Sequence, residues 1–173
     1  MSPTARGPSA PGPVGATPRL RRATHADASA LAELFWRVRL ESVPHVPMIV
    51  HPRDSVEPFV RNVLLTEFEV WLAELDGRPV GFLALMAPDV LGHLYISAQH
   101  TGHGLGGRFL ELARQRFPDG LQLWAFQSNE RAIRFYERHG FVATEWTDGD
   151  NEEGEPDVRM SWGPFAASPQ SPL

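Results

Sequence analysis

Residues 93–110 read HLYISAQHTGHGLGGRFL, from His93 to Leu110. The apolar run Leu91–Ile96, which overlaps the start of this segment, predicts a short buried strand. Beyond a polar connector, apolar residues recur at the spacing of an amphipathic helix, at Leu105, Phe109, Leu112 and Ala113. A glycine-rich turn between a strand and a helix directs several backbone N–H groups and the positive end of the helix dipole at one point. The segment therefore predicts a site for a phosphate or pyrophosphate.

The glycines of this segment, Gly102, Gly104 and Gly106, are weak evidence by themselves. Glycine suits close backbone approach to a ligand and a positive φ, but glycines also serve simply to turn a chain. No Lys-Ser or Lys-Thr pair follows them as in a P-loop, and their spacing differs from the dinucleotide-binding fingerprint. The glycines alone leave an anion site and a plain turn both open.

A second informative segment, residues 129–141, reads NERAIRFYERHGF. Gly140 stands where the C′ glycine of a helix belongs. Asn129 and Tyr136 are seven residues apart, so they would share one face of that helix. The spacing fits a pair of site residues, but it also fits a helix cap and a core aromatic residue.

Together the two segments resemble motifs A and B of the GNAT (Gcn5-related) N-acetyltransferases. Motif A has a strand ending Leu-Tyr-Val and then Arg/Gln-x-x-Gly-x-Gly/Ala, which Leu94–Ile96 and Thr101–Gly106 resemble at the same offset. Motif B, Asn-x-x-Ala-x-x-Phe-Tyr-x-x-x-Gly-Phe, is matched at every specified position. Thr101 stands where the family usually has Arg or Gln, which keeps the backbone cradle but puts one side-chain contact with the cofactor in question. The resemblance covers residues 19–162.

The resemblance implies a GNAT-like α/β fold: a mixed, partly antiparallel sheet flanked by helices, with a splayed central strand pair. The residues themselves agree, because an Asp-Gly pair at 76–77 between two apolar runs predicts a β-hairpin. A short helix is expected over 55–65. We expect one domain over residues 18–162, with the Pro-, Gly-, Ala- and Ser-rich segments 1–17 and 163–173 as disordered tails.

The resemblance also implies the roles of individual residues. Tyr136 is the candidate general acid, because a phenol holds its proton at neutral pH and can give it to a thiolate. His93 is a candidate general base, with a structural histidine as the alternative and Glu67 and Glu69 as weaker candidates. The carbonyl of the thioester is expected to meet the amide of Ile96. Acetyl-CoA, as co-substrate, is expected to contact Leu94, Tyr95, Ile96, Thr101, Gly102, His103, Gly104, Leu105, Gly106, Gly107 and Asn129.

The implied activity is transfer of an acetyl group from acetyl-CoA directly to an amine of a small molecule or peptide. The chain has no cysteine, which removes the best-suited acyl-enzyme nucleophile and favours direct attack. A non-catalytic acyl-CoA-binding module used for sensing or assembly is the alternative. The acidic segment 148–157 would attract a cationic acceptor if it borders the site, and would otherwise be solvated surface.

Composition excludes some classes of partner. The net charge of −5 argues against a nucleic-acid binder. No apolar run reaches membrane-spanning length and the N-terminus lacks a signal peptide, so we expect a cytoplasmic protein that does not bind membranes. His45 and His51 have no nearby acid or thiolate, so no metal site is expected. Monomer and homodimer are both left open.

Overall fold

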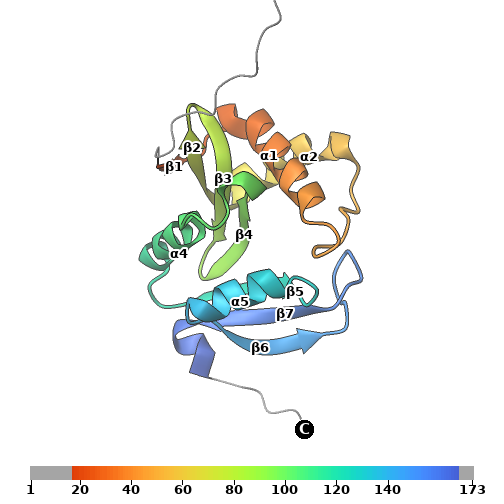
Figure 1. Cartoon of the computed structure of the whole chain (residues 1–173), viewed down its shortest axis with the longest axis vertical. Coiled ribbons are helices and arrows are strands. Elements are labelled where there is room, and N and C mark those ends of the chain that lie inside the picture. The colour runs from red at the N-terminus through yellow and green to blue at the C-terminus, as the bar shows by residue number, and fades with distance from the viewer. Residues whose placement is uncertain (1–16, 168–173) are drawn as a thin grey trace, which may run out of the picture.

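The computed structural model describes residues 17–167, in which one sheet has the strand order β1-β2-β3-β4-β5-β7-β6 (Figure 1). All neighbouring strands are antiparallel except β4 and β5, which are parallel. The strands are β1 (Arg19–Arg22), β2 (Glu69–Leu75), β3 (Arg78–Met86), β4 (Val90–Ile96), β5 (Leu121–Phe126), β6 (Val142–Thr147) and β7 (Asp157–Trp162). The expected mixed sheet is confirmed.

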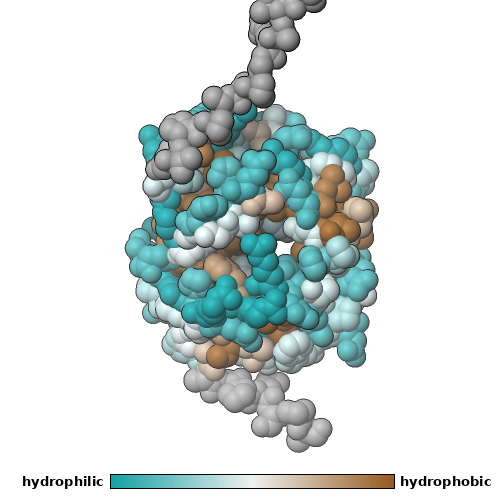
Figure 2. Space-filling view, viewed as in Figure 1, coloured by the Kyte–Doolittle hydropathy of each residue, from teal (hydrophilic) through white to brown (hydrophobic). Residues whose placement is uncertain are grey.

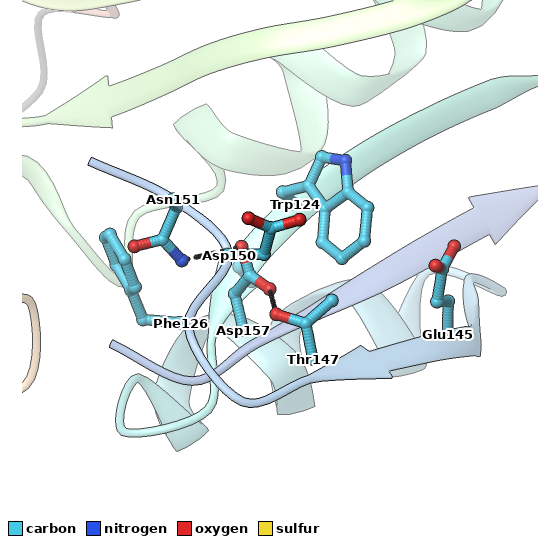
Figure 3. Close-up of a pocket in the computed structure, with 8 residues that line it drawn as sticks. Trp124, Phe126, Glu145, Thr147, Asp150, Asn151 and Asp157 are labelled. Atoms are coloured by element: carbon cyan, nitrogen blue, oxygen red, sulfur yellow. Dashed lines mark hydrogen bonds between the residues drawn. The ribbon is translucent and has the colours of Figure 1, made fainter. Parts of the chain in front are cut away.

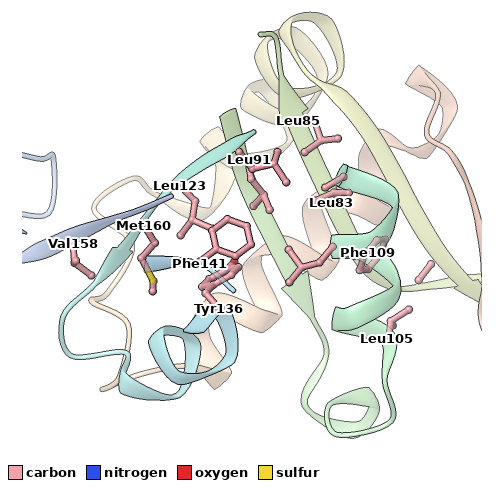
Figure 4. Packing of buried hydrophobic residues seen from close by; sticks show 14 of the residues in the cluster. Leu83, Leu85, Leu91, Leu105, Phe109, Leu123, Tyr136, Phe141, Val158 and Met160 are labelled. Atoms are coloured by element: carbon pink, nitrogen blue, oxygen red, sulfur yellow. The ribbon is translucent and has the colours of Figure 1, made fainter. Parts of the chain in front are cut away.

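Helices cover both faces of the sheet (Figure 1). Helix α1 (Ala28–Glu41) and α2 (Arg53–Phe59) pack on one face of β2 and β3, where Phe82 and Leu72 are fully buried among their apolar residues. Helix α4 (Leu105–Arg116) packs on the opposite face, and α5 (Glu130–Arg138) covers β5 and β7 (Figure 4). The shorter elements are η1 (His25–Asp27), η2 (Val60–Leu64), α3 (Leu65–Glu67), η3 (Ala98–His100) and η4 (Gly163–Ala167).

The hairpin between β2 and β3 has the turn that its sequence predicts. Asp76 and Gly77 have φ angles of 50° and 74°, and Leu75 pairs with Arg78 across them. Two consecutive positive φ angles characterise the two-residue turns whose twist matches that of the flanking strands. The hairpin pairs β3 with β2, and the other edge of β3 pairs with β4, the strand that leads into the glycine loop.

The sheet opens between β4 and β5. These strands share a single ladder pair, Val90 with Gln122, at their N-terminal ends. Beyond that pair they separate, so the C-terminal halves of both strands leave backbone groups without a strand partner at this position. The splayed pair that the resemblance implies is thus present, and it divides the sheet into an arm of β1–β4 and an arm of β5, β7 and β6.

Some element boundaries differ from the expected ones. The helix expected over 55–65 begins at Arg53 and continues, through a π-helical segment, to Glu67. Segment 163–173 was expected to be a tail, but Gly163–Ala167 forms a 3-10 helix in which the Phe165 ring lies against Gly120. The remainder of that tail, residues 168–173, and residues 1–16 of the other one lie outside the described residues.

The segment between α1 and α2 is the main apolar surface in the view of Figure 2. Met48 and Val50 in this segment are 57% and 53% exposed, and Leu40 and Val43 beside them are also exposed. Helix α1 ends at Glu41, and the prolines Pro44 and Pro47 keep the chain from continuing it. This segment borders the opening of the sheet described next.

Candidate active site

A groove of about 460 Å³ lies where the sheet opens. Its walls are the C-terminal half of β4, the glycine loop, helix α5 and the end of α1. The lining residues are Val38, Ser42, Val46, Leu94, Tyr95, Ile96, His100, Thr101, Gly102, Gly104, Gly106, Gly107, Asn129, Arg131, Ala132, Phe135, Tyr136, Arg138 and His139. The two segments singled out in the sequence therefore face each other across one cavity.

The glycine loop adopts a backbone that side chains would strain. Gly102 and Gly104 both have a φ of +81°, and Gly104 is the N-cap of α4. A Cβ at either position would meet no atom within 4 Å, so the space beside this backbone is open to a ligand. The first N–H groups of α4 have no partner within the helix and carry its positive dipole end. The loop can therefore hold a pyrophosphate, as its sequence predicts.

Gly106 has a different role, which is to bring two helices together. A Cβ at this position would come within 2.9 Å of the Phe135 ring, so only glycine lets α4 and α5 approach this closely. The contact fixes the width of the groove between the loop and α5. Gly107 is less constrained, since its Cβ would lie 3.4 Å from the Nε2 atom of His139.

Thr101 contributes to the shape of the loop. Its hydroxyl donates a hydrogen bond of 2.8 Å to the carbonyl oxygen of Ala98, and Ser97 and His100 are joined by a second side-chain hydrogen bond of 2.8 Å. Both bonds close the 3-10 turn that links β4 to the glycines. The threonine thus stabilises the loop internally, where an arginine or glutamine would extend outward.

Asn129 serves as the N-cap of α5 and also lines the groove. Its Oδ1 atom accepts a hydrogen bond of 3.2 Å from the backbone N–H of Ala132. The amide nitrogen of the same side chain makes no hydrogen bond with the described residues. The two interpretations of its spacing are therefore compatible, because one end of the side chain caps the helix and the other can meet a ligand.

Tyr136 lies at the floor of the groove, held by aromatic neighbours. Its ring packs edge-on against Phe135 and Phe141, at centroid distances of 5.2 and 5.4 Å, and the residue is 7% exposed. Burial, with a smaller contribution from Tyr95, raises the pKa of the Tyr136 phenol above its usual value. The hydroxyl makes no hydrogen bond within residues 17–167. Tyr136 thus presents to the cavity a protonated hydroxyl that has no hydrogen-bond partner among the described residues.

His93 lies in an aromatic cluster under α1 and does not line the groove. Its ring is 5.9 Å from that of Phe35 and stacks on Tyr95 at 5.8 Å. Burial, and to a lesser degree the charge of Arg39, lowers the pKa of His93 to about 4. The structure therefore does not bring His93 and Tyr136, the two candidate catalytic residues, to the same cavity.

Of the residues expected to contact acetyl-CoA, all line the groove except two. Leu105 is 3% exposed and packs in the core, so only its backbone N–H can serve a ligand. His103 is exposed on the loop but outside the lining. Glu67 and Glu69, the weaker candidates for general base, are also absent from the lining; Glu69 pairs instead with Arg22 and Arg116.

Sequence reasoning missed the cations that α5 places along the groove. Arg131 and Arg138 both line it and are exposed. They are seven residues apart, which sets them on one helix face, so the spacing used for Asn129 and Tyr136 would also have found them. Guanidinium groups bind phosphates strongly, and their position opposite the glycine loop adds positive charge to the same cavity.

The acidic segment 148–157 folds back across the opening of the sheet. Glu153 forms an ion pair with Arg39 of α1, with an N···O distance of 3.1 Å, and Glu152 lies 2.9 Å from His51. On the same side, the Ser128 hydroxyl donates a hydrogen bond of 3.0 Å to the carbonyl oxygen of His45. These contacts join the two arms of the sheet where the ladder does not.

Residues 66–143 match the model of an acetyltransferase (GNAT) domain. A curated relative, peptidyl-lysine N-acetyltransferase YiaC of Escherichia coli, is 30% identical over 145 residues, which are 83% of this chain and 95% of the relative. The chain belongs to the GNAT acetyltransferase family. A mycothiol acetyltransferase of Acidimicrobium ferrooxidans is 35% identical over 138 residues, which are 68% of this chain and 41% of that protein.

The fold of this GNAT acetyltransferase agrees with that assignment. The solution structure of apo YjaB from Escherichia coli superposes with a TM-score of 0.64 at 25% identity, covering 83% of this chain and 96% of that one. The expected family, fold class and activity, acetyl transfer from acetyl-CoA to an amine, are confirmed. None of the helices in the described residues is long and apolar enough to cross a membrane. Residues 17–167 contain no group of three or more side chains suited to hold a metal ion.

Proposed function

We propose that the groove binds acetyl-CoA and that the acetyl group passes directly to a primary amine of a small molecule or peptide. The observation that carries the proposal is the pairing, across one cavity, of an open glycine loop at a helix N-terminus with a protonated tyrosine. The relative YiaC is named as acting on peptidyl-lysine, which supports an amine on a flexible chain as acceptor.

The loop and the arginines would hold the cofactor by its phosphates. The backbone at Gly102 and Gly104 has open space beside it, and Arg131 and Arg138 add charge from the other wall. The free amide nitrogen of Asn129 is available to a carbonyl of the pantetheine arm. These contacts are remote from the reacting atoms and would position the thioester in the splay between β4 and β5.

The backbone of β4 supplies a donor for the thioester carbonyl. The N–H of Ser97 donates to the carbonyl oxygen of Val80 on β3 at 2.9 Å. Because successive N–H groups of a strand point to opposite sides, the N–H of Ile96 points away from β3, into the splay. A fixed amide there can stabilise the negative charge that develops on the carbonyl oxygen, which is typically worth about 10²–10³-fold in rate.

The reaction then forms one bond and breaks another. The amine nitrogen attacks the carbonyl carbon, the C–N bond forms, the C–S bond breaks, and the amine loses one proton to solvent or a base. Tyr136 donates its proton to the departing thiolate and regains one from water. The pKa of Tyr136, raised by burial, keeps this proton in place at neutral pH. The buried position of His93 favours water as the carrier of the amine proton.

A thiol-release assay tests the proposal. The full chain is incubated with acetyl-CoA and a panel of primary amines, and free coenzyme A is measured together with the mass of the acetylated product. We expect amine-dependent thiol release with a mass increase of one acetyl group. Binding of acetyl-CoA without transfer to any amine of the panel would favour the non-catalytic binding module instead.

A further inference from the structure

A second cavity, of about 440 Å³, lies on the arm formed by β5, β7 and β6 (Figure 3). Aromatic rings and carboxylates make up most of its wall. The lining residues are Trp124, Ala125, Phe126, Glu145, Thr147, Asp150, Asn151 and Asp157. No residue of the acetyl-CoA groove lines this cavity, so it is a separate site.

This cavity lies on the opposite side of β5 from helix α5. Leu123 is 3% exposed and belongs to the core cluster that contains Tyr136 (Figure 4). Trp124 is the next residue and is 49% exposed, as expected when successive side chains of a strand point to opposite faces. Phe126 is the last residue of β5, at the end where this strand has separated from β4. A ligand in the cavity therefore lies beside the splay, on the side away from α5.

Of the three carboxylates around the cavity, one is paired with a protein cation. Glu145 is paired with Arg159 at 2.8 Å, and that guanidinium lies 5.8 Å from the centre of the Trp124 ring. Within the described residues, neither Asp150 nor Asp157 has an Arg or His nitrogen within 4.0 Å. Two carboxylates of the wall thus have no cationic partner of their own.

Of the two carboxylates, Asp157 gives the stronger evidence for a cation in the cavity, because it is buried. The residue is 8% exposed, and its oxygens accept hydrogen bonds from the Thr147 hydroxyl and, at 3.0 Å, from the amide of Asn151. Both donors are neutral, so they orient the carboxylate without cancelling its charge. A buried charge is costly unless it is paired, and a cation in the cavity would supply the missing charge.

We propose that the cavity binds a second positive charge of the acceptor, so that the preferred substrates are diamines and polyamines. The inference rests on the proposed function, because it assigns one amine of the acceptor to the splay. The bound ammonium would lie near Asp150 and Asp157 with the Trp124 ring beside it, since aromatic faces attract cations. The reactive amine, uncharged when it attacks, extends past Phe126 at the end of β5.

The test compares acceptors that differ only in the second charge. The full chain is assayed with α,ω-diamines from propane-1,3-diamine to octane-1,8-diamine, each beside the monoamine of equal chain length. We expect the ratio of kcat/KM, diamine to monoamine and counted per primary amine, to reach about tenfold at the best length, from one ion pair and one cation–π contact. Equal kcat/KM per primary amine at every chain length would overturn the proposal.

Two matched variants locate the effect. Asp150→Asn should bring the ratio of kcat/KM close to one, whereas Asp148→Asn, which changes a neighbouring exposed acid outside the lining, should keep it. An equal loss in both variants would show that the loop acts only through its overall charge, and the cavity would not be the site. Added salt should lower the ratio, because the contact is partly electrostatic.

A binding measurement separates this inference from the proposed function. The indole N–H signal of Trp124, assigned with Trp124→Phe, is followed by NMR while the best diamine, or its monoamine, is added without acetyl-CoA. A saturable shift with the diamine alone supports the cavity, even if no amine is acetylated. Acetylation of monoamines and diamines alike, with no shift of the Trp124 signal, would leave the proposed function intact and reject the cavity.

Discussion

Arg39 and Glu153, 114 residues apart in the sequence, form an ion pair that connects helix α1 to the loop between β6 and β7. The Arg39 side chain is 9% exposed and also donates to the carbonyl oxygen of Pro47 at 3.1 Å and to the hydroxyl of Tyr95 at 3.5 Å. One guanidinium thus contacts the segment after α1, the central strand β4 and the opposite arm of the sheet. The pair holds together the loops that border the splay.

Removing Glu153 should therefore affect both stability and acceptor binding. We expect Glu153→Gln to lower the free energy of unfolding by about 1–3 kcal/mol, because a buried guanidinium loses its counter-charge. The loop would also lose its fixed position, which should raise the acceptor KM more than it lowers kcat. Chemical denaturation and steady-state kinetics check both effects. The matched control is Glu155→Gln, an exposed acid without an ion pair in residues 17–167, which should leave both quantities unchanged.

Acetyl-CoA affinity should follow how well residue 104 tolerates a positive φ. We expect the affinity, measured by calorimetry, to fall in the order Gly104, Gly104→Asn and Gly104→Val, because asparagine adopts this conformation more readily than a β-branched residue. The valine side chain would also occupy the open space beside the amides. Gly77→Val, at a φ of +74° in the distant hairpin, should cost stability without changing affinity. Equal losses of affinity at both positions would show that strain, and not the site, is responsible.

Tyr136→Phe tests the general acid. We expect kcat to fall by about 10²–10⁴-fold while the acetyl-CoA dissociation constant changes little, because the hydroxyl acts only when the thiolate departs. The pKa of Tyr136 is raised, so its proton is retained at alkaline pH. The rate of the unaltered protein should therefore show no loss from this group up to about pH 10. A kcat within about threefold of the original would assign proton donation to water or to another residue.

His93 should make the stability depend on pH in a defined window. Its pKa is about 4 in the fold and about 6.5 when unfolded, so the unfolded chain binds the proton more readily. The contribution of His93 is fully present above pH 6.5 and is lost as the pH falls towards 4, by at most about 3 kcal/mol. Denaturation at a series of pH values should show this slope, and His93→Gln should remove it.

A control keeps that slope from being assigned to other groups. His103→Gln, which changes an exposed histidine, should keep the slope. The pKa of Asp27 is lowered to about 2 by its hydrogen bonds with Arg21. The stability that this carboxylate contributes to the fold is therefore lost only below about pH 4. The two windows are therefore separate. An unchanged slope in His93→Gln would mean that another group takes up the proton.

Local patterns were enough to predict most elements of this fold. The Asp76-Gly77 pair fixed the hairpin, and the glycine after residue 139 ended α5, because turn chemistry depends on a few neighbouring residues. The opening between β4 and β5 followed only from the family resemblance. Each of the two strands is apolar and short, and neither sequence contains a signal that the two strands share a single ladder pair.

The candidate site was predicted less evenly, for physical reasons. His93 and Tyr95 lie on one face of β4, but the helix that covers this face could not be predicted from the strand itself. The partners of the acidic loop were also out of reach, since Arg39 lies more than a hundred residues earlier. Long-range ion pairs have no local signature, so the segment 148–157 could be recognised as charged but not as structured.

The single ladder pair between Val90 and Gln122 has a consequence for how the protein unfolds. Because the two arms share one ladder pair, their contact rests mainly on side chains, among them Arg39 with Glu153 and the hydrophobic cluster that contains both Leu91 and Leu123. A ligand that binds in the opening between β4 and β5 contacts both arms of the sheet, and so it stabilises the folded arrangement of the two arms. Acetyl-CoA would then add contacts across the opening that the backbone ladder lacks, and the protein should resist unfolding more strongly for as long as the cofactor stays bound.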